Sequence, residues 1–501
     1  MQHLLRRLLL VLAGAAQTLS FSPFEWWIAA PLSILAILIL CIRLEPGTLF
    51  RAGWLVGLGL FGSGASWVYV SIYHHGIPSI PIAGAMTLIF VAGLALFTGL
   101  VFWCWGKLAG NVVWRRLALF PVVWILGDWL RGWILTGFPW LFLGTSQVDG
   151  PMAGWAPVLG VHGVTMLILV STALVFAAIR SWLAQQPRLT ALLAALALAP
   201  WLAGPALNTV QYTAVGEEPI TFAAIQGNIP QEVKWNPDAL QRQINTYLNL
   251  SEPHWGKDVI LWPETAVPTA HTHAADVLDY LDERGLESDT TLLTGVPWFG
   301  RSDDQPERRF HNSLLAAGRD GGVYHKQRLV PFGEYVPLER WLRGTFDFFD
   351  LPLSSFTPGP SQQPPMSVGG IPVHPFICYE IAYADFVARH ANGTGYLVTV
   401  SNDAWFGRSF GPLQHLQIAR MRALETQRYM LRGTNNGVTA VVDDRGRIQD
   451  QAPQFEQTTL TGELYPAWGR TPFMATGSWP VLTIAAIVIV FTRRRKEPRK
   501  D

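Results

Sequence analysis

Three residues in the second half of the chain have the types and positions needed for acyl transfer. Glu264 lies in the segment LWPETAVP, Lys326 in YHKQRLVPFGEYVP and Cys378 in HPFICYEI. Each accompanies an apolar run typical of a strand, so each is expected at a strand end, where sites form in open α/β sheets. Together they offer a base, a cation and a nucleophile, the set that performs acyl transfer through a thioester. The cation would favour the thiolate and stabilise the oxyanion of the tetrahedral intermediate.

Each of these residues also has an ordinary structural explanation when it is considered alone. Glu264 could be an exposed loop carboxylate and Lys326 a surface lysine. Cys378 could be a small buried hydrophobe, although it is the only cysteine after residue 210. The combination of the three, each within its own distinctive segment, favours the catalytic interpretation.

The region around the three residues alternates predicted strands and helices, which indicates a layered α/β fold. Helices are expected at 236–250, 274–286 and 413–431. The strands are expected at 220–229, 258–267, 290–299, 312–318, 322–330, 374–381, 394–403 and 458–464, with a hairpin over 437–446.

The charge distribution separates this region from the residues before it. Residues 1–210 contain 14 Asp, Glu, Lys and Arg side chains, and the remainder of the 501-residue chain contains 59. A helix needs about 20 apolar residues to cross a bilayer. Eight segments qualify as candidate spans, at roughly 6–23, 26–42, 52–73, 84–106, 116–135, 160–179, 189–207 and 474–492.

Lys and Arg in the short loops predict the orientation of these spans. Every second loop is basic, and the tail RRRKEPRK follows the eighth span. Both termini are therefore expected in the cytoplasm and residues 211–473 on the opposite side, which is the periplasm in a bacterium. A cleaved signal peptide at the N-terminus is an alternative, but it would break this alternation.

Composition excludes several classes of protein. Half of the residues are hydrophobic and the net charge is +1, so there is no global basic field to gather nucleic acid. The three cysteines cannot form a disulfide framework, and the usual zinc-site patterns are absent. We therefore expect no metal and no diffusible cofactor.

The motifs WPETAVP, HKQRLVPFGEYVP and ICYEI resemble the three signatures of the nitrilase (carbon–nitrogen hydrolase) superfamily. With seven spans before them and one after, they resemble the apolipoprotein N-acyltransferase family of Gram-negative bacteria, and GFPWL in the helical part also resembles that family. The resemblance implies a helical membrane bundle of about eight spans carrying a nitrilase-like αββα sandwich. The implied domains are a seven-span domain at 1–210, a periplasmic catalytic domain at 211–473, and a last helix with a basic cytoplasmic tail at 474–501.

The same resemblance implies roles for individual residues. Glu264 would be the base, Lys326 the oxyanion stabiliser and Cys378 the nucleophile. Four further positions match supporting or substrate-handling residues of the family: Trp235, Glu334, Tyr379 and Glu380. Glu334 would help to position the lysine, and the backbone N–H of Tyr379 would complete the oxyanion hole.

The implied reaction is the last step of bacterial lipoprotein maturation. A phospholipid, preferably phosphatidylethanolamine, would donate its sn-1 acyl chain to the cysteine. The resulting thioester would acylate the α-amine of the N-terminal diacylglyceryl-cysteine of an apolipoprotein in a ping-pong cycle. The triad alone leaves open a membrane-tethered amidase, because water and an amine can attack the same thioester.

Four further features of the sequence allow a functional or a structural interpretation. Asp128 and Arg131 can face each other on a predicted membrane helix. They would be a structural ion pair or, in a transporter, part of a polar path. The apolar loop at 137–160 could lie on the bilayer surface or be packed between helices. The aromatic stretch 341–356 is a candidate mobile lid or, alternatively, a loop packed in the core. Residues 402–411 are a second candidate edge of the entrance to the site.

Overall fold

The computed structural model describes residues 2–302, 305–337 and 356–494. It divides into two compact units, one of residues 1–210 and 476–501 and one of residues 211–475. Most of the candidate lid at 341–356 and most of the basic C-terminal tail lie outside the described residues.

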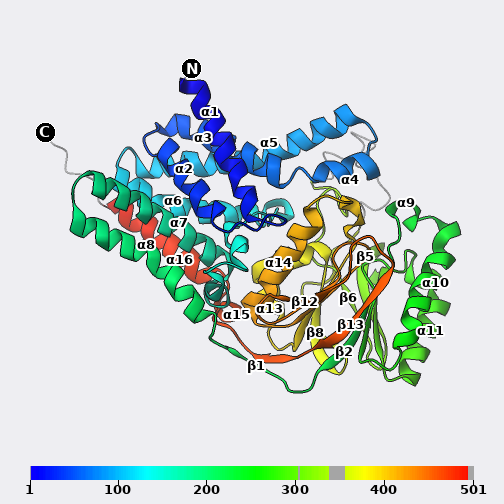
Figure 1. The fold of residues 1–501 in the computed structure, drawn as a ribbon. Helices are drawn as coiled ribbons and strands as arrows, with labels where there is room; N and C mark the ends of the chain where they lie inside the picture. The colour runs from blue at the N-terminus through cyan, green and yellow to red at the C-terminus, as the bar shows by residue number, and fades with distance from the viewer. Residues whose placement is uncertain (1, 303–304, 338–355, 495–501) are drawn as a thin grey trace. The chain divides into compact units, whose positions relative to one another are not determined.

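The first unit is helical (Figure 1). Its α-helices are α1 (Gln2–Ala16), α2 (Ala29–Cys41), α3 (Pro46–Gly64), α4 (Val68–His75), α5 (Ile80–Ala109), α6 (Val113–Arg131), α7 (Ala156–Leu183), α8 (Pro187–Leu207) and α16 (Trp479–Arg494). Although α16 is far from α6 and α7 in sequence, Val481 and Ala485 on it share a buried cluster with Ile125 and Met166.

Among the described residues, three apolar helical segments are long enough to cross a membrane: Ile80–Ala109, Ala153–Leu183 and Pro187–Leu207. A fourth is possible if α3 and α4, which are bent by 59°, form one span. The helices α2 and α16 are apolar but shorter. The structure therefore supports three or four spans, and the count of about eight stays a prediction.

The Asp128–Arg131 pair fastens the loop that follows α6. Arg131 Nη2 lies 2.8 Å from Asp128 Oδ1, and Arg131 Nη1 donates to the carbonyls of Phe138 and Trp140, each at 2.7 Å. Most of residues 139–157 are buried within the unit. These contacts favour the structural interpretation of the pair and the packed interpretation of the loop.

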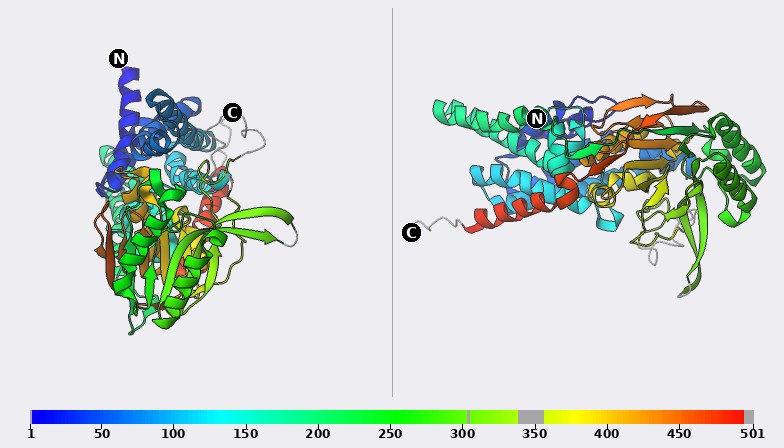
Figure 2. Two further views of the ribbon diagram at one scale, coloured as in Figure 1. Left: turned by 90° about the vertical axis from the view of Figure 1, so that its right-hand side faces the viewer. Right: turned by 90° about the horizontal axis from the view of Figure 1, so that it is seen from below.

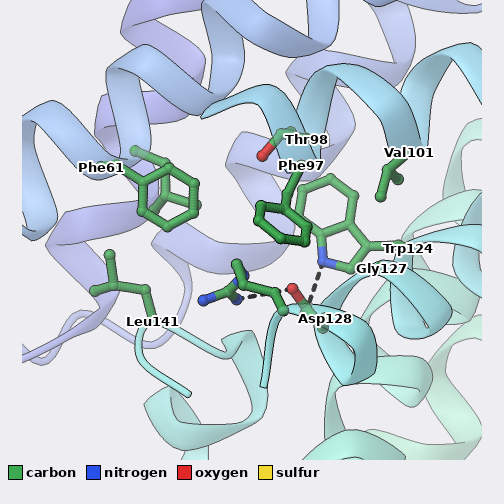
Figure 3. A pocket seen from close by; sticks show the side chains of 10 residues that line it. Phe61, Phe97, Thr98, Val101, Trp124, Gly127, Asp128 and Leu141 are labelled. Atoms are coloured by element: carbon green, nitrogen blue, oxygen red, sulfur yellow. Dashed lines mark hydrogen bonds and ion pairs between the residues drawn. The ribbon is translucent and has the colours of Figure 1, made fainter. Parts of the chain in front are cut away.

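A small cavity lies beside this ion pair (Figure 3). Phe61, Phe97, Trp124 and Asp128 are among the side chains that line it, and its volume is about 20 Å³. That volume holds about one water molecule. The cavity therefore adds no evidence for a transport path or a lipid site.

The second unit contains two six-stranded mixed sheets and a small two-stranded sheet. One large sheet has the order β12-β11-β10-β9-β8-β7, and the other has the order β13-β2-β3-β4-β5-β6. The strands are β1 (Thr213–Val215), β2 (Ile220–Gln226), β3 (Val259–Leu261), β4 (Thr291–Ser302), β5 (Gln305–Gly318), β6 (Gly322–His325), β7 (Met366–Val368), β8 (Ile371–Ile377), β9 (Tyr396–Ser401), β10 (Met430–Thr434), β11 (Ala440–Val442), β12 (Ile448–Gln451), β13 (Thr458–Leu464) and β14 (Ala467–Gly469).

The two large sheets pack face to face around a common apolar core. Phe222 and Leu261 from one sheet share a buried cluster with Val373 and Leu431 from the other. The α-helices of this unit are α9 (Gln231–Lys234), α10 (Leu240–Ser251), α11 (Ala275–Glu287), α13 (Ala384–His390), α14 (Gly411–Thr426) and α15 (Pro472–Thr476). Helices α10 and α11 cover the outer face of the β2-containing sheet, and α13 and α14 lie against the other sheet (Figure 1). The layers are thus helix, sheet, sheet and helix, as expected.

Two local features of this unit bear on the sequence predictions. The prediction of one helix over 413–431 is wrong beyond Thr426, because Gln427 adopts the left-handed conformation (φ 46°) and ends α14. Residues 430–434 form β10, which pairs in parallel with β9 in the sheet interior. The hairpin of β4 and β5 extends beyond the neighbouring strands (Figure 2).

The small sheet joins the two ends of the unit. Strand β1, near its start, pairs antiparallel with β14, near its end, through the register Thr213–Gly469, Ala214–Trp468 and Val215–Ala467. The chain therefore enters and leaves this unit along two paired strands.

Candidate active site

Strand direction brings the predicted site residues to one region of the second unit. β2, β3 and β4 are parallel, and β6 runs in the same direction because it is antiparallel to β5, which is antiparallel to β4. Glu264 follows β3 and Lys326 follows β6, so both lie at the same edge of their sheet. Cys378 follows β8 in the facing sheet.

Lys326 and two glutamates form a buried charged cluster. Lys326 Nζ lies 2.9 Å from the carboxylate of Glu334 and 3.4 Å from Glu264 Oε1. Burial alone would lower the pKa of Lys326, but the negative charges of Glu334 and Glu264 outweigh it and raise that pKa. The two carboxylates thus stabilise the protonated form of this buried lysine.

Asn312 links the two carboxylates from the neighbouring strand. Its Nδ2 donates to Glu264 Oε1 at 2.7 Å and to Glu334 Oε1 at 2.8 Å. The backbone carbonyl of Asn312 accepts a hydrogen bond from the backbone N–H of Lys326 at 2.8 Å. One side chain on β5 thus fixes both carboxylates relative to the lysine.

The remaining contacts of Glu264 come from two other segments. The backbone N–H of Asn402 donates to Glu264 Oε2 at 2.9 Å. The buried Lys234 ammonium donates to the backbone carbonyl of Glu264 at 3.1 Å. Burial lowers the pKa of Lys234 to about 8. Glu264 is therefore held through its backbone and through both carboxylate oxygens.

The loop that carries Glu264 lies directly against strand β4 at Gly295. A Cβ atom at position 295 would meet the backbone N of Thr265 at 2.2 Å and the Cα of Glu264 at 2.8 Å. Both neighbours are backbone atoms, so they could not rotate away as a side chain can. Glycine at 295 is what permits this close approach.

Replacing Gly295 with alanine is accordingly expected to displace Glu264. The sequence predicts that Glu264 is the catalytic base, and a displacement of about 1 Å in such a group can cost about 10²-fold in rate. We expect a loss of that order in the predicted acyl loading of Cys378. Gly300→Ala on the same strand is the matched control, because its nearest neighbour would be a His311 ring atom at 3.9 Å. Equal rates for the two alanine variants, measured by intact-protein mass spectrometry, would contradict the expectation.

Cys378 occupies a sharp turn between a strand and a helical turn. β8 ends at Ile377, and a 3-10 turn covers Cys378–Ala382. Cys378 has φ 54°, a left-handed conformation that costs a non-glycine residue about 1–3 kcal/mol. Burial and the charge of Glu264 raise the pKa of its thiol, while the charge of Lys326 lowers it. The raising influences are the larger, so this environment favours the protonated form of the Cys378 thiol.

Glu380 ties the nucleophile turn to the lysine segment. Its Oε2 accepts the Ile377 N–H at 2.8 Å, and its Oε1 accepts the Gln327 N–H at 2.7 Å and the Tyr324 hydroxyl at 2.9 Å. Burial raises the pKa of Glu380 to about 7, and these donors stabilise its ionised form. Glu380 thus ties the segment that carries Cys378 to the segment that carries Lys326.

The other two predicted supporting residues lie at the margins of this cluster. Tyr379, which is largely buried, stacks edge-on against Tyr383. Trp235 follows the buried Lys234 at the end of α9, and 36% of its surface is exposed. Its exposure is compatible with a contact to substrate.

Two family models match the chain. Residues 13–174 match "Apolipoprotein N-acyltransferase N-terminal domain", and residues 221–472 match "Carbon-nitrogen hydrolase". The Apolipoprotein N-acyltransferase of Pseudomonas aeruginosa (strain LESB58) is 44% identical, over 97% of this chain and 94% of that protein. The chain belongs to the apolipoprotein N-acyltransferase family. The member from Azotobacter vinelandii (strain DJ / ATCC BAA-1303) is 44% identical, over 98% of this chain and 95% of that protein. The member from Coxiella burnetii (strain RSA 493 / Nine Mile phase I) is 37% identical, over 97% of this chain and 99% of that protein.

The sequence analysis missed three residues that hold Glu264 in this member of the apolipoprotein N-acyltransferase family. Asn312, Lys234 and Asn402 all contact Glu264. The signal for Asn312 was present, because an amide at the start of the apolar run NSLLAAG must find buried partners. Asn402 lies within the segment predicted as an edge of the entrance. Lys234 had no signal, since a lysine in a short polar helix is usually exposed.

Proposed function

We propose that this protein is an apolipoprotein N-acyltransferase that works through a thioester on Cys378. The observation that carries the proposal is the convergence of Glu264, Lys326 and the Cys378 turn in a chain with apolar helices that belongs to this family. Acyl chains of donor and acceptor would remain in the bilayer, which explains why a nitrilase-like unit is joined to such helices.

In the first half-reaction, Cys378 Sγ attacks the sn-1 ester carbonyl of a phospholipid such as phosphatidylethanolamine while Glu264 takes the thiol proton. Among the described residues, the Lys326 ammonium has two carboxylate partners, which leaves one of its three N–H donors for the oxyanion. The backbone N–H of Tyr379 is the second donor. When the tetrahedral intermediate collapses, the ester C–O bond breaks, and Glu264 returns the proton to the departing lysophospholipid.

In the second half-reaction, the α-amine of the diacylglyceryl-cysteine attacks the thioester carbonyl. Glu264 accepts a proton from the amine, and the same donors stabilise the second oxyanion. The C–S bond then breaks, the amide is released, and the proton returns to Cys378. No group beyond the two substrates is consumed.

We further propose that the protein lies in the inner membrane of a bacterium, with residues 211–473 in the periplasm and both termini in the cytoplasm. The support is the alternation of basic and uncharged loops in the sequence. Under this proposal, a reporter that works only in the cytoplasm is expected to be active when it is fused at the C-terminus.

Mass spectrometry of the intact protein tests the proposed function. Incubation in detergent with phosphatidylethanolamine and no acceptor is expected to add one acyl chain, which hydroxylamine removes and Cys378→Ala lacks. A diacylated lipopeptide with a free α-amine is then expected to discharge the adduct as its amide. A folded protein that gains no acyl mass but hydrolyses small amides would instead be a membrane-tethered amidase.

A further inference from the structure

The carbonyl group of the proposed nucleophile is held by a buried histidine outside the triad. His415 on α14 is 4% exposed, and its Nε2 lies 3.1 Å from the backbone oxygen of Cys378. A carbonyl oxygen only accepts hydrogen bonds. Nε2 therefore carries a hydrogen and donates it, whether the ring is neutral or protonated.

The other side of the ring is fixed by an equally buried ion pair. Arg432 Nη2 and Asp403 Oδ1 each lie 3.1 Å from His415 Nδ1, so this nitrogen has a partner in either protonation state. Arg432 Nη2 also lies 2.8 Å from Asp403 Oδ2. The Ser401 hydroxyl donates to Asp403 Oδ1 at 2.6 Å. The ring is thus anchored to the end of β9, which neighbours β8, and to β10, which lies on the other side of β9.

Peptide geometry transmits this anchoring to the next residue. The peptide between Cys378 and Tyr379 is planar and trans, so its C=O and N–H point in opposite directions. A hydrogen bond that fixes the carbonyl therefore also fixes the direction of the Tyr379 N–H. Rotation of this peptide plane would change ψ of Cys378 and φ of Tyr379, so the hydrogen bond restrains both torsions in a turn whose first residue is left-handed (φ 54°).

We propose that His415 is a positioning residue that locks the Cys378–Tyr379 peptide and aims the Tyr379 N–H at the oxyanion. This inference rests on the proposed function, because it assumes acyl transfer at Cys378. His415 acts by keeping one oxyanion-hole donor in place.

Three substitutions at position 415 separate the hydrogen bond from the packing. His415→Leu removes the donor. His415→Gln can place an amide N–H near the position of Nε2, whereas His415→Asn is one methylene shorter and cannot reach the carbonyl. His390→Leu is the matched control, since His390 lies on α13 and its ring hydrogen-bonds to the Phe386 carbonyl rather than to the site.

Two rates are measured on the full-length protein in detergent. The first is thioester formation from phosphatidylethanolamine, which passes through an oxyanion. The second is alkylation of Cys378 by iodoacetamide, followed by peptide mass spectrometry, which displaces iodide without forming an oxyanion. Loss of one oxyanion donor costs about 10²–10³-fold. We expect that loss in the acylation rate of the Leu and Asn variants, with an unchanged KM for the lipid and an alkylation rate within about threefold of the unsubstituted protein.

The remaining outcomes each decide the inference. Recovery of the acylation rate to within about tenfold in His415→Gln supports it, and the Gln–Asn comparison suffices if the Leu variant does not fold. Equal loss of the acylation and alkylation rates would show that the whole turn is disrupted, and it would overturn the inference. The inference would also be overturned if His415→Leu were acylated as fast as the control His390→Leu. Absence of any thioester in the unsubstituted protein would instead overturn the proposed function.

Discussion

Replacing Lys326 with methionine is expected to lower the rate of thioester formation by at least about 10³-fold. The substitution removes an oxyanion donor, whose loss alone costs about 10²–10³. It also removes the charge that lowers the pKa of the Cys378 thiol. Alkylation of Cys378 requires the thiolate, so its onset should move to higher pH. Both rates can be followed by mass spectrometry, with Lys257→Met as the control for loss of a lysine elsewhere in the unit.

A second substitution separates the catalytic role of Lys326 from its structural role. Without the lysine, Glu264 and Glu334 would share the Asn312 amide with no cation between them. Breaking a buried ion pair in this way costs about 3–5 kcal/mol. Adding Glu334→Gln removes one of the two charges, so the double variant should regain thermal stability but not activity. Recovery of acyl loading along with stability would show that Lys326 only compensates charge.

Replacing Glu264 with glutamine is expected to slow thioester formation by about 10²–10⁴-fold, the range for loss of a general acid–base group. The departing lysophospholipid would receive no proton. Yet the charge of Glu264 raises the pKa of the Cys378 thiol, so its removal should lower that pKa. The onset of alkylation should therefore move to lower pH, opposite to the shift in Lys326→Met.

Acylation and alkylation should thus change in opposite directions in Glu264→Gln. The matched control is Glu287→Gln, a substitution of an exposed glutamate on α11, which should change neither rate. An alkylation onset that moves to higher pH would mean that Glu264 supports the thiolate rather than opposing it. A normal acylation rate would remove Glu264 from the role of base.

The sequence predicted the parts of this site that follow from strand ends. The apolar runs before Glu264 and Cys378 are the strands β3 and β8, which belong to the two facing sheets, and each residue directly follows its strand or the short turn after it. The contacts of Asn312 with two carboxylates could not be predicted, because they depend on the register of β5 with β6. The same is true of His415, which lies in the long predicted helix but meets Cys378 only through packing of α14 against the sheet.

Errors in the fold prediction have equally local causes. Residues 427–431 read as a continuation of a helix, since the apolar run YML suits a helix as well as a buried strand. In the structure, the turn at Gln427 ends the helix, and the pairing of β10 with β9 makes residues 430–434 a strand. In the helical unit, hydropathy marked segments that are helices in the structure. It could not supply their lengths, and α2 has only 13 residues.

The paired strands β1 and β14 have a consequence for the synthesis of the chain. They mark residues 211–475 as an insertion between α8 and α16, although α16 packs with α6 and α7. The ribosome must therefore translate the whole insertion before the helical bundle can receive its last helix. At about 5–20 residues per second, this takes roughly 13–50 s, during which the surface of α6 and α7 that α16 will cover stays open. That interval is when a membrane chaperone or a protease would recognise the nascent protein, and a truncation before Trp479 should extend it indefinitely.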